Sequence, residues 1–457
     1  MPPLAPGFDA RLDQFLSYLG EELPRSDQRE KFALYTLGLL SDAERKSIEP
    51  IATQAEPASP EAAHQALLHF VANSPWNDRA VRRRALAWGL WGLSAAAPVN
   101  TTILDDTGIL KQGKASVGVQ RQYTGSAGKI TNCQVAVTLC VSNGHDTLPV
   151  DIALYLPQSW ADDPERRLKV RVPERVEFQT KGQIAREMLR QAAADGVPLG
   201  DLLLADADYG RDPETRALAG ELGMNYAVGI HRSQRIWDAR GVWTAPMTVA
   251  ELCGYLSGRS FKRLSWRDDT QGRRLSARFA FRRVYLADGS REPERGRDRP
   301  VWLIMEWRDG EAAPGRFYVS DLPRRWTRKA LVRALKERWR TERMYEDLKG
   351  EVGFDHYEGR SWPGWNHHMS VVLSAYALLV AERCMAFPPG APGDPSVDPH
   401  GGKARPPRRR FAAVVATRLC RCGPRSVVAP MPHLRPRTGA PERAAGTGRT
   451  RTANLTQ

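Results

Sequence analysis

The order of strand-like and helix-like stretches after Pro98 limits the possible folds more than any other feature of this sequence. Three stretches rich in Val, Ile, Leu and Thr, which favour strands, come first, at 99–108, 130–144 and 146–157. Stretches typical of helix, strand, helix and strand then alternate, at 181–196, 201–210, 212–223 and 224–230. A strand meander followed by alternating helices and strands predicts an α/β fold with a mixed sheet.

The segments on either side of this core have different patterns. Residues 1–97 are predicted to form a helical N-terminal domain, because apolar residues recur at helical spacing. Residues 232–320 interrupt the alternation with short strand-like runs and predict a β-rich insertion. The core is therefore expected to resume at 321–387, with a helix over 328–350. Residues 388–457 are rich in Pro, Gly and Arg and are predicted to be a disordered, basic tail.

The net charge of +15 suggests a polyanionic partner, but it is unevenly spread. Residues 403–457 carry 13 Lys or Arg and one acid, so nearly all of the excess lies in the predicted tail. The bulk charge therefore says little about the core, and nucleic-acid binding has to be argued from local clusters.

Cysteine usage and hydropathy indicate a cytoplasmic protein. The six cysteines form no CxxC pair, which favours reduced thiols over disulfides or zinc ligands. The first residues lack the pattern of a secretory signal. The longest apolar stretch, 370–381, is too short to span a bilayer, so we expect a buried helix and no membrane contact.

Acidic residues stand at the predicted ends of two strands. Asp105 and Asp106 follow the first strand, and Asp206 and Asp208 follow a later one. Functional groups collect at strand ends in open α/β sheets. Together with Glu342 on the predicted helix, these acids supply the oxygen ligands that Mg²⁺ prefers. Each acid taken alone has an ordinary explanation, as a turn cap or a local ion pair.

Glu342 lies on a stripe with two cations, because Arg338 precedes it by four positions and Lys349 follows it by seven. A surface salt-bridge ladder would give this pattern. A metal-binding carboxylate flanked by phosphate-binding cations would give it too. Trp339 could likewise stack on a DNA base or pack as an ordinary helix residue.

Two rival interpretations, a phosphate-binding loop and a histidine metal site, have weaker support in the sequence. Residues 108–115 nearly match a phosphate-binding loop, but Ala115 replaces the metal-binding hydroxyl and no helix is predicted to follow. His367 and His368 are adjacent, so on a helix they point in different directions and do not form a metal pair.

The acids and their surroundings resemble the DDE-type transposases of bacterial insertion sequences. Arg338, Glu342 and Lys349 match the spacing of a Y-(2)-R-(3)-E-(6)-K signature, with Leu335 in place of its tyrosine. The stretch 105–137 is similar to the first-aspartate block of these enzymes, and "ADADYG" is similar to the second, with Asp208 in place of a glycine.

The resemblance covers about residues 10–385 and implies a ribonuclease H-like core with an insertion before the third acid. It implies that Asp105, Asp206 and Glu342 are the catalytic, metal-binding triad for two Mg²⁺ ions, with Mn²⁺ able to substitute. It implies an endonuclease that cuts and rejoins DNA at the ends of an insertion sequence. A catalytically decayed, DNA-binding descendant of such an enzyme is the alternative.

The same resemblance implies DNA as the partner. Residues 1–97 would be a DNA-binding domain, and the expected DNA contacts elsewhere are Arg338, Lys349, Trp339, Lys111, Lys114 and Arg121. A homodimer is expected when the protein holds paired transposon ends and target DNA, in the bacterial cytoplasm at the nucleoid.

Overall fold

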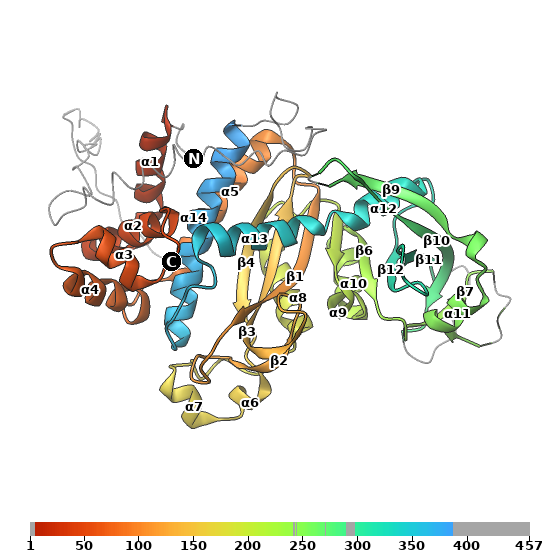
Figure 1. Ribbon diagram of the computed structural model, residues 1–457, viewed down its shortest axis with the longest axis horizontal. Helices are drawn as coiled ribbons and strands as arrows, with labels where there is room; N and C mark the ends of the chain where they lie inside the picture. The colour runs from red at the N-terminus through yellow and green to blue at the C-terminus, as the bar shows by residue number, and fades with distance from the viewer. Residues whose placement is uncertain (1–4, 241–242, 244, 270, 289–297, 387–457) are drawn as a thin grey trace, which may run out of the picture.

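A large mixed sheet forms the centre of the protein (Figure 1). The computed structural model describes residues 5–240, 243, 245–269, 271–288 and 298–386. The strands are β1 (Thr101–Leu110), β2 (Gln120–Thr124), β3 (Lys129–Ser142), β4 (Thr147–Leu154), β5 (Leu202–Ala205), β6 (Asn225–Ile230), β7 (Arg235–Asp238), β8 (Met247–Thr248), β9 (Lys262–Asp268), β10 (Arg274–Leu286), β11 (Val301–Trp307) and β12 (Arg316–Ser320).

The strand order is β2-β3-β1-β5-β6-β12-β11-β10-β7-β8, with β4 also on β3 and β9 also on β10. The β1–β5 and β5–β6 pairs are parallel, and the other pairs are antiparallel. The predicted α/β class with a mixed sheet is therefore confirmed. Strands β7 to β12 come from the segment 232–320, and the last of them, β12, joins the segment to the core by pairing with β6.

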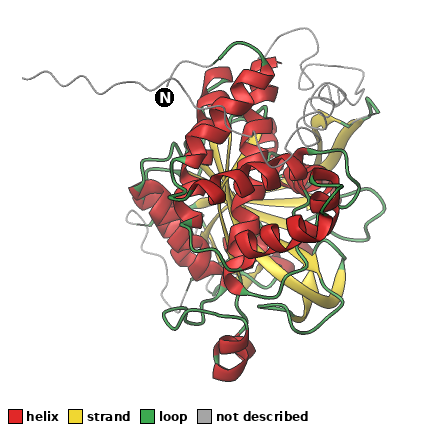
Figure 2. Cartoon of the chain, turned by 90° about the vertical axis from the view of Figure 1, so that its left-hand side faces the viewer, coloured by secondary structure: helices red, strands yellow, loops and turns green. Residues whose placement is uncertain are grey.

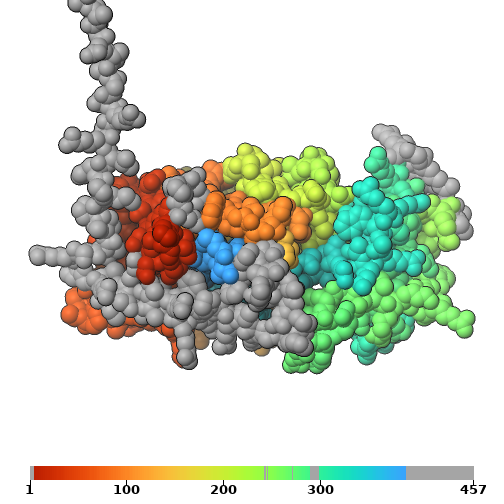
Figure 3. Space-filling view, turned by 90° about the horizontal axis from the view of Figure 1, so that it is seen from above, coloured from red at the N-terminus to blue at the C-terminus, as the bar shows by residue number. Residues whose placement is uncertain are grey.

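Helices gather at the N-terminal end and on the faces of the sheet (Figure 2). The first five are α1 (Phe8–Gly20), α2 (Ser26–Leu40), α3 (Ile48–Ala55), α4 (Pro60–Ala72) and α5 (Asp78–Ala96). The others are α6 (Gln158–Ala161), α7 (Pro164–Lys169), α8 (Lys181–Ala194), α9 (Ala207–Gly210), α10 (Pro213–Glu221), α11 (Val249–Tyr255), α12 (Arg328–Lys336), α13 (Trp339–Val352) and α14 (Trp362–Ala386). Seen from above, the molecule is elongated, with α1 to α5 at one end and the strand-rich segment at the other (Figure 3).

The apolar helix near the end of the described chain is buried, as predicted. Helix α14 is long and apolar enough to cross a membrane by composition, but 78% of its most apolar window lies inside the protein. It packs along α5, where Gly92 lets the two backbones approach closely. The core is therefore built from both ends of the described chain. The predicted tail, 388–457, lies outside the described residues.

Three sequence expectations need correction. Strand β1 does not end at its acids but continues to Leu110, because β3 still pairs with it there. The strand predicted over 201–210 ends at Ala205, since Asp206 caps α9. The single helix predicted over 328–350 is two, α12 and α13. At the break, tighter bonds of the i to i+3 type join Glu337 to Arg340 and Arg338 to Thr341.

Candidate active site

The pairing of β1 with β5 brings two predicted acids together. These strands run parallel, with Leu104 opposite Ala205, so Asp105 and Asp206 are the next residues along each strand. Asp206 leaves the strand and caps α9, because its Oδ1 accepts hydrogen bonds from the backbone N–H groups of Asp208 (2.9 Å) and Tyr209 (3.3 Å). The two carboxylates therefore meet where the parallel pairing ends.

Arg338 connects this pair to the third predicted acid. It lies at the start of α13, and its Nη1 donates to Asp105 Oδ2 at 2.7 Å. Its Nη2 donates to Glu342 Oε1 at 3.4 Å, one helical turn further on. Asp105 is buried, whereas the Glu342 side chain is 63% exposed. Glu342 is thus linked to Asp105 through the guanidinium group of Arg338, which donates a hydrogen bond to each of them.

Burial changes the acidity of both aspartates. It raises the pKa of Asp105 to about 7, against the opposing effect of Arg338 and with the help of the charges on Asp206 and Asp106. Burial also raises the pKa of Asp206, with Arg338 again opposing and Asp106 and Asp208 adding to it. The ionised forms of two neighbouring carboxylates are therefore disfavoured, and an additional cation between them would favour both.

The donor set fits a hard divalent cation, because every candidate ligand is a carboxylate oxygen. Within the described ranges, however, no three His, Cys, Asp or Glu residues are close enough together to hold a metal ion. The reason is visible in the contacts, since Arg338 lies between Asp105 and Glu342. Arg338 therefore separates the first and the third of the predicted acids.

Asp106 lies on the opposite side of β1 from Asp105, since successive strand residues face opposite sides of a sheet, but its charge still acts on Asp206. Its Oδ2 accepts hydrogen bonds from Lys181 Nζ and from the Tyr209 hydroxyl, both at 3.0 Å. Sequence reasoning missed Lys181 and Tyr209. The available signals were the helix start at Thr180, which caps α8, and the position of Tyr209 inside the second acid block. Asp208 faces His231 at 3.6 Å and is exposed.

Lys349 makes three hydrogen bonds instead of facing solvent. Its Nζ donates to Thr107 Oγ1 at 2.9 Å, to the Gly108 carbonyl at 3.0 Å and to Ser126 Oγ at 3.0 Å. Burial lowers its pKa. Lys349 therefore joins α13 to β1 and to the turn between β2 and β3.

The other predicted DNA contacts differ in exposure. Lys114 and Arg121 are exposed. Lys111 is half-buried and donates to the Tyr357 carbonyl, and burial lowers its pKa to about 8. Trp339 is half-buried, with the guanidinium of Arg267 from β9 lying 4.0 Å from its ring centroid. The strand-rich segment thus reaches the helix that carries Glu342.

The remaining candidates from the sequence have structural roles. His368 is buried, with Nδ1 hydrogen bonded to the Tyr35 hydroxyl, and His367 stacks on Trp76. No helix follows the sequence that resembles a phosphate-binding loop, since 111–119 lacks one.

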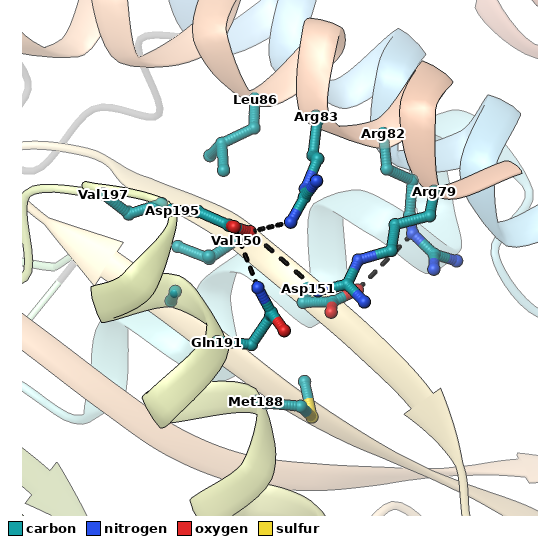
Figure 4. A pocket seen from close by; sticks show the side chains of 11 residues that line it. Arg79, Arg82, Arg83, Leu86, Val150, Asp151, Met188, Gln191, Asp195 and Val197 are labelled. Carbon is teal, nitrogen blue, oxygen red and sulfur yellow. Dashed lines mark hydrogen bonds and ion pairs between the residues drawn. The ribbon is translucent and has the colours of Figure 1, made fainter.

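A small pocket lies between α5, α8 and β4, and Arg79, Arg82 and Arg83 line it (Figure 4). Asp195 pairs with Arg79 and Arg83, and Asp151 pairs with Arg82. Arg84, next in the chain, pairs with Glu21 and Glu22. These arginines hold the helices and the sheet together, so the pocket is a junction of internal ion pairs.

Comparisons with known proteins identify the family of the chain. The chain is 25% identical over 351 residues to a protein of Microchaete diplosiphon described as a probable transposase for insertion sequence element IS701, covering 75% of this chain and 84% of that protein. A family model described as DDE superfamily endonuclease matches residues 18–293, more than half of the chain. The match includes Asp105 and Asp206 and ends before Glu342. The protein belongs to the DDE superfamily endonucleases.

Proposed function

We propose that the protein is an insertion-sequence transposase, which cuts and rejoins DNA at the ends of its element by phosphoryl transfer. The family supports an endonuclease acting on DNA, and the relative from Microchaete diplosiphon supports transposition. The observation that carries the proposal is the meeting of Asp105 and Asp206 at the end of the β1–β5 pairing, with Glu342 joined to them through Arg338.

In this proposal the core, residues 98–231 and 321–387, has a ribonuclease H-like fold, and 232–320 is its insertion. Asp105, Asp206 and Glu342 hold two Mg²⁺ ions, for which Mn²⁺ can substitute. Such ions activate the attacking oxygen and stabilise the leaving oxygen in phosphoryl transfer. The raised pKa values of the two buried aspartates support a site completed by added positive charge.

Arg338 has a second role in the proposal. While Arg338 pairs with Asp105 and Glu342, its positive charge offsets the charge of these carboxylates in the absence of metal ions. Once these acids are occupied, its planar guanidinium is free to bind two oxygens of a DNA phosphate. The side chain therefore exchanges carboxylate for phosphate as the site fills.

The DNA contacts proposed around this centre are Arg338, Lys349, Trp339, Lys111, Lys114 and Arg121. Residues 1–97 are proposed as a DNA-binding domain, and two copies of the chain are proposed to hold paired ends in the bacterial cytoplasm. Lys114 and Arg121 are exposed, which supports their role directly. Lys349 and Lys111 have internal partners and must exchange them to contact phosphate.

Mg²⁺-dependent cleavage of a duplex that carries the element's own end tests the proposal. Asp105→Asn, Asp206→Asn and Glu342→Gln should each abolish cleavage and leave DNA binding intact. The matched controls are Asp106→Asn and Asp208→Asn, which should keep substantial activity. Asparagine at 106 can still accept hydrogen bonds from Lys181 and Tyr209.

Two outcomes would contradict these assignments. Cleavage that survives Asp105→Asn but not Asp106→Asn would transfer the metal-binding role to the opposite face of β1. A wild-type protein that binds the end but never cleaves it would be the catalytically decayed, DNA-binding alternative.

A further inference from the structure

The β2–β3 hairpin exposes large side chains that have no evident function within the fold. Tyr123 and Ile130 are direct partners across the hairpin and are 64% and 61% exposed. Partners in an antiparallel pair point to the same side and lie in contact distance. They therefore form one apolar patch on a narrow projecting element, and such patches commonly mark interaction surfaces.

The hairpin is fixed with respect to the active site. Lys349 donates to Ser126 in its turn and to Thr107 and Gly108 in β1, and the hydroxyl groups of Thr107 and Ser126 lie 3.2 Å apart. Thr107 is two residues beyond Asp105 along β1. Lys349 follows Glu342 by seven residues, about 10 Å along the same helix. The turn is thus held beside the strand and the helix that carry the catalytic carboxylates.

The positive charge of this region indicates which class of molecule it binds. Residues 107–142 contain Lys111, Lys114, Arg121 and Lys129 and no acidic residue. Arg121 and Lys129 are exposed on the hairpin. Arg121 shares a face with Tyr123 because it lies two positions earlier in the strand, whereas Lys129 directly precedes Ile130 and faces the other side. This combination of cations and an exposed aromatic ring fits a nucleic acid.

A second copy of the chain fits less well. In a two-fold contact the same patch meets itself, so Arg121, which shares the face of the patch, would approach its own copy without a compensating acid. A DNA duplex instead offers phosphates to the cations and sugar or base surfaces to the Tyr123 ring.

We propose that the β2–β3 hairpin, residues 120–133, is an arm that contacts the DNA duplex beside the bond to be cut. Tyr123 and Ile130 lie against sugars or bases, and Arg121, on the same face, binds a phosphate. In the free protein, Lys349 holds the turn of this arm in place. The position of the arm relative to the cut rests on the proposed function.

The test is the affinity for a fluorescent duplex that carries the element's end and its flanking sequence, measured in Ca²⁺ so that no cutting interferes. Tyr123→Ala with Ile130→Ala should raise Kd at least tenfold and leave the salt dependence unchanged, because no phosphate contact is lost. Arg121→Ala should lower the slope of log K against log salt by about 0.9, the usual contribution of one phosphate contact.

Tyr255→Ala is the matched control, because Tyr255 is 79% exposed on α11, away from the hairpin (Figure 1). It should bind like the wild type, and all variants should keep the wild-type unfolding midpoint. A wild-type Kd for the Tyr123→Ala and Ile130→Ala double variant would overturn the proposal. So would a wild-type dimer in free solution that this variant converts to a monomer, because the occupant would then be a second copy.

Cleavage of the same duplex in Mg²⁺ separates this inference from the proposed function. If the wild type cuts and the double variant binds and cuts equally well, only the hairpin proposal fails. If the wild type does not cut but the double variant still loses affinity, only the catalytic proposal fails.

Discussion

At the scale of single residues, Arg338 sets the charge of the site. It is the cation nearest to a buried aspartate whose pKa burial raises to about 7, and it also reaches Glu342. Leaving a buried charge without its partner is far more costly than losing an exposed pair. Arg338 therefore stabilises the carboxylates before DNA arrives, and the proposed exchange to phosphate gives the same side chain a catalytic use.

Replacing Arg338 separates these roles. Arg338→Ala should lower end cleavage by about 10² to 10³-fold, the usual loss when one group that stabilises developing charge is removed. Arg338→Lys should restore little, because an ammonium group lacks the guanidinium fork. Calorimetric titration with Mn²⁺ should show that both variants still bind metal. Intact cleavage in Arg338→Ala would show that Arg338 serves only to stabilise the fold through its pair with the buried Asp105.

Lys111 gives a prediction about pH. Its pKa is about 8 in the folded protein and about 10.4 in an unfolded chain. Between these values the unfolded chain binds more protons, so stability should rise with pH in that window, and the full penalty applies below pH 8. Lys111→Met should therefore stabilise the protein at pH 7, on the order of 1 to 3 kcal/mol.

Urea unfolding of wild type and Lys111→Met at several pH values checks this, and the gain should shrink as pH rises from 8 towards 10. Lys114→Met is the control, because Lys114 is exposed. A lower salt dependence of DNA binding in Lys111→Met would instead favour the direct DNA contact proposed for this residue.

At the scale of elements, β1 has two sides with different duties. Asp105 faces Arg338 at the start of α13 and Asp106 faces Lys181 of α8, while Thr107 of β1 contacts Ser126 in the β2–β3 turn. Gly108 makes this contact possible. A Cβ at this position would lie 2.0 Å from Thr124 Oγ1 and 2.7 Å from its Cβ, so only glycine lets the turn come this close.

Gly108→Ala should therefore displace the turn and destabilise the protein by roughly 1 to 3 kcal/mol, the usual cost of forcing extra atoms into a packed site. Adding Thr124→Gly should recover part of the loss, which a double-mutant cycle of unfolding free energies would measure. Gly113→Ala is the control, because a Cβ there meets no atom within 4 Å. Equal costs at 108 and 113 would show that the contact is unimportant.

The elements also show where sequence reasoning reaches its limit. The alternation of strands and helices was readable, because hydrophobic periodicity is local. The break between α12 and α13 was not, because Glu337 and Arg338 keep helical backbone angles and give no breaker signal. Lys181 and Tyr209 were missed for a related reason. Lys181 is 75 positions and Tyr209 is 103 positions from Asp106 in the sequence, so only tertiary packing brings them into contact with it.

At the scale of the whole molecule, the first and last described segments form one unit. Helices α5 and α14 pack at a seam where Gly89 and Gly92 face Ala377 and Ala381. A Cβ at Gly92 would lie 2.5 Å from the backbone Cα of Ala381, which cannot move as a side chain can. The proposed DNA-binding domain is therefore attached directly to the helix that follows α13.

Gly92→Ala should separate these helices and lower the thermal midpoint, with a cost of roughly 1 to 3 kcal/mol. Gly254→Ala in α11 is the control. A Cβ there meets nothing within 4 Å, so the substitution should be neutral or should stabilise by roughly 0.5 to 1 kcal/mol through helix propensity. A Gly92→Ala protein as stable as the control would show that the seam tolerates separation.

The packing of α5 against α14 also determines how late in synthesis the core of the protein can be completed. A ribosome makes α5 nearly 270 residues before it makes the start of α14. Throughout that interval the apolar seam of α5 has no covering helix, so the nascent chain should depend on holding chaperones and should be open to proteases. Glu342 is also synthesised only in this late stretch. Interrupted translation products that stop before it would carry the first two acids without the third, and under the proposed function such an unfinished copy could not cut DNA.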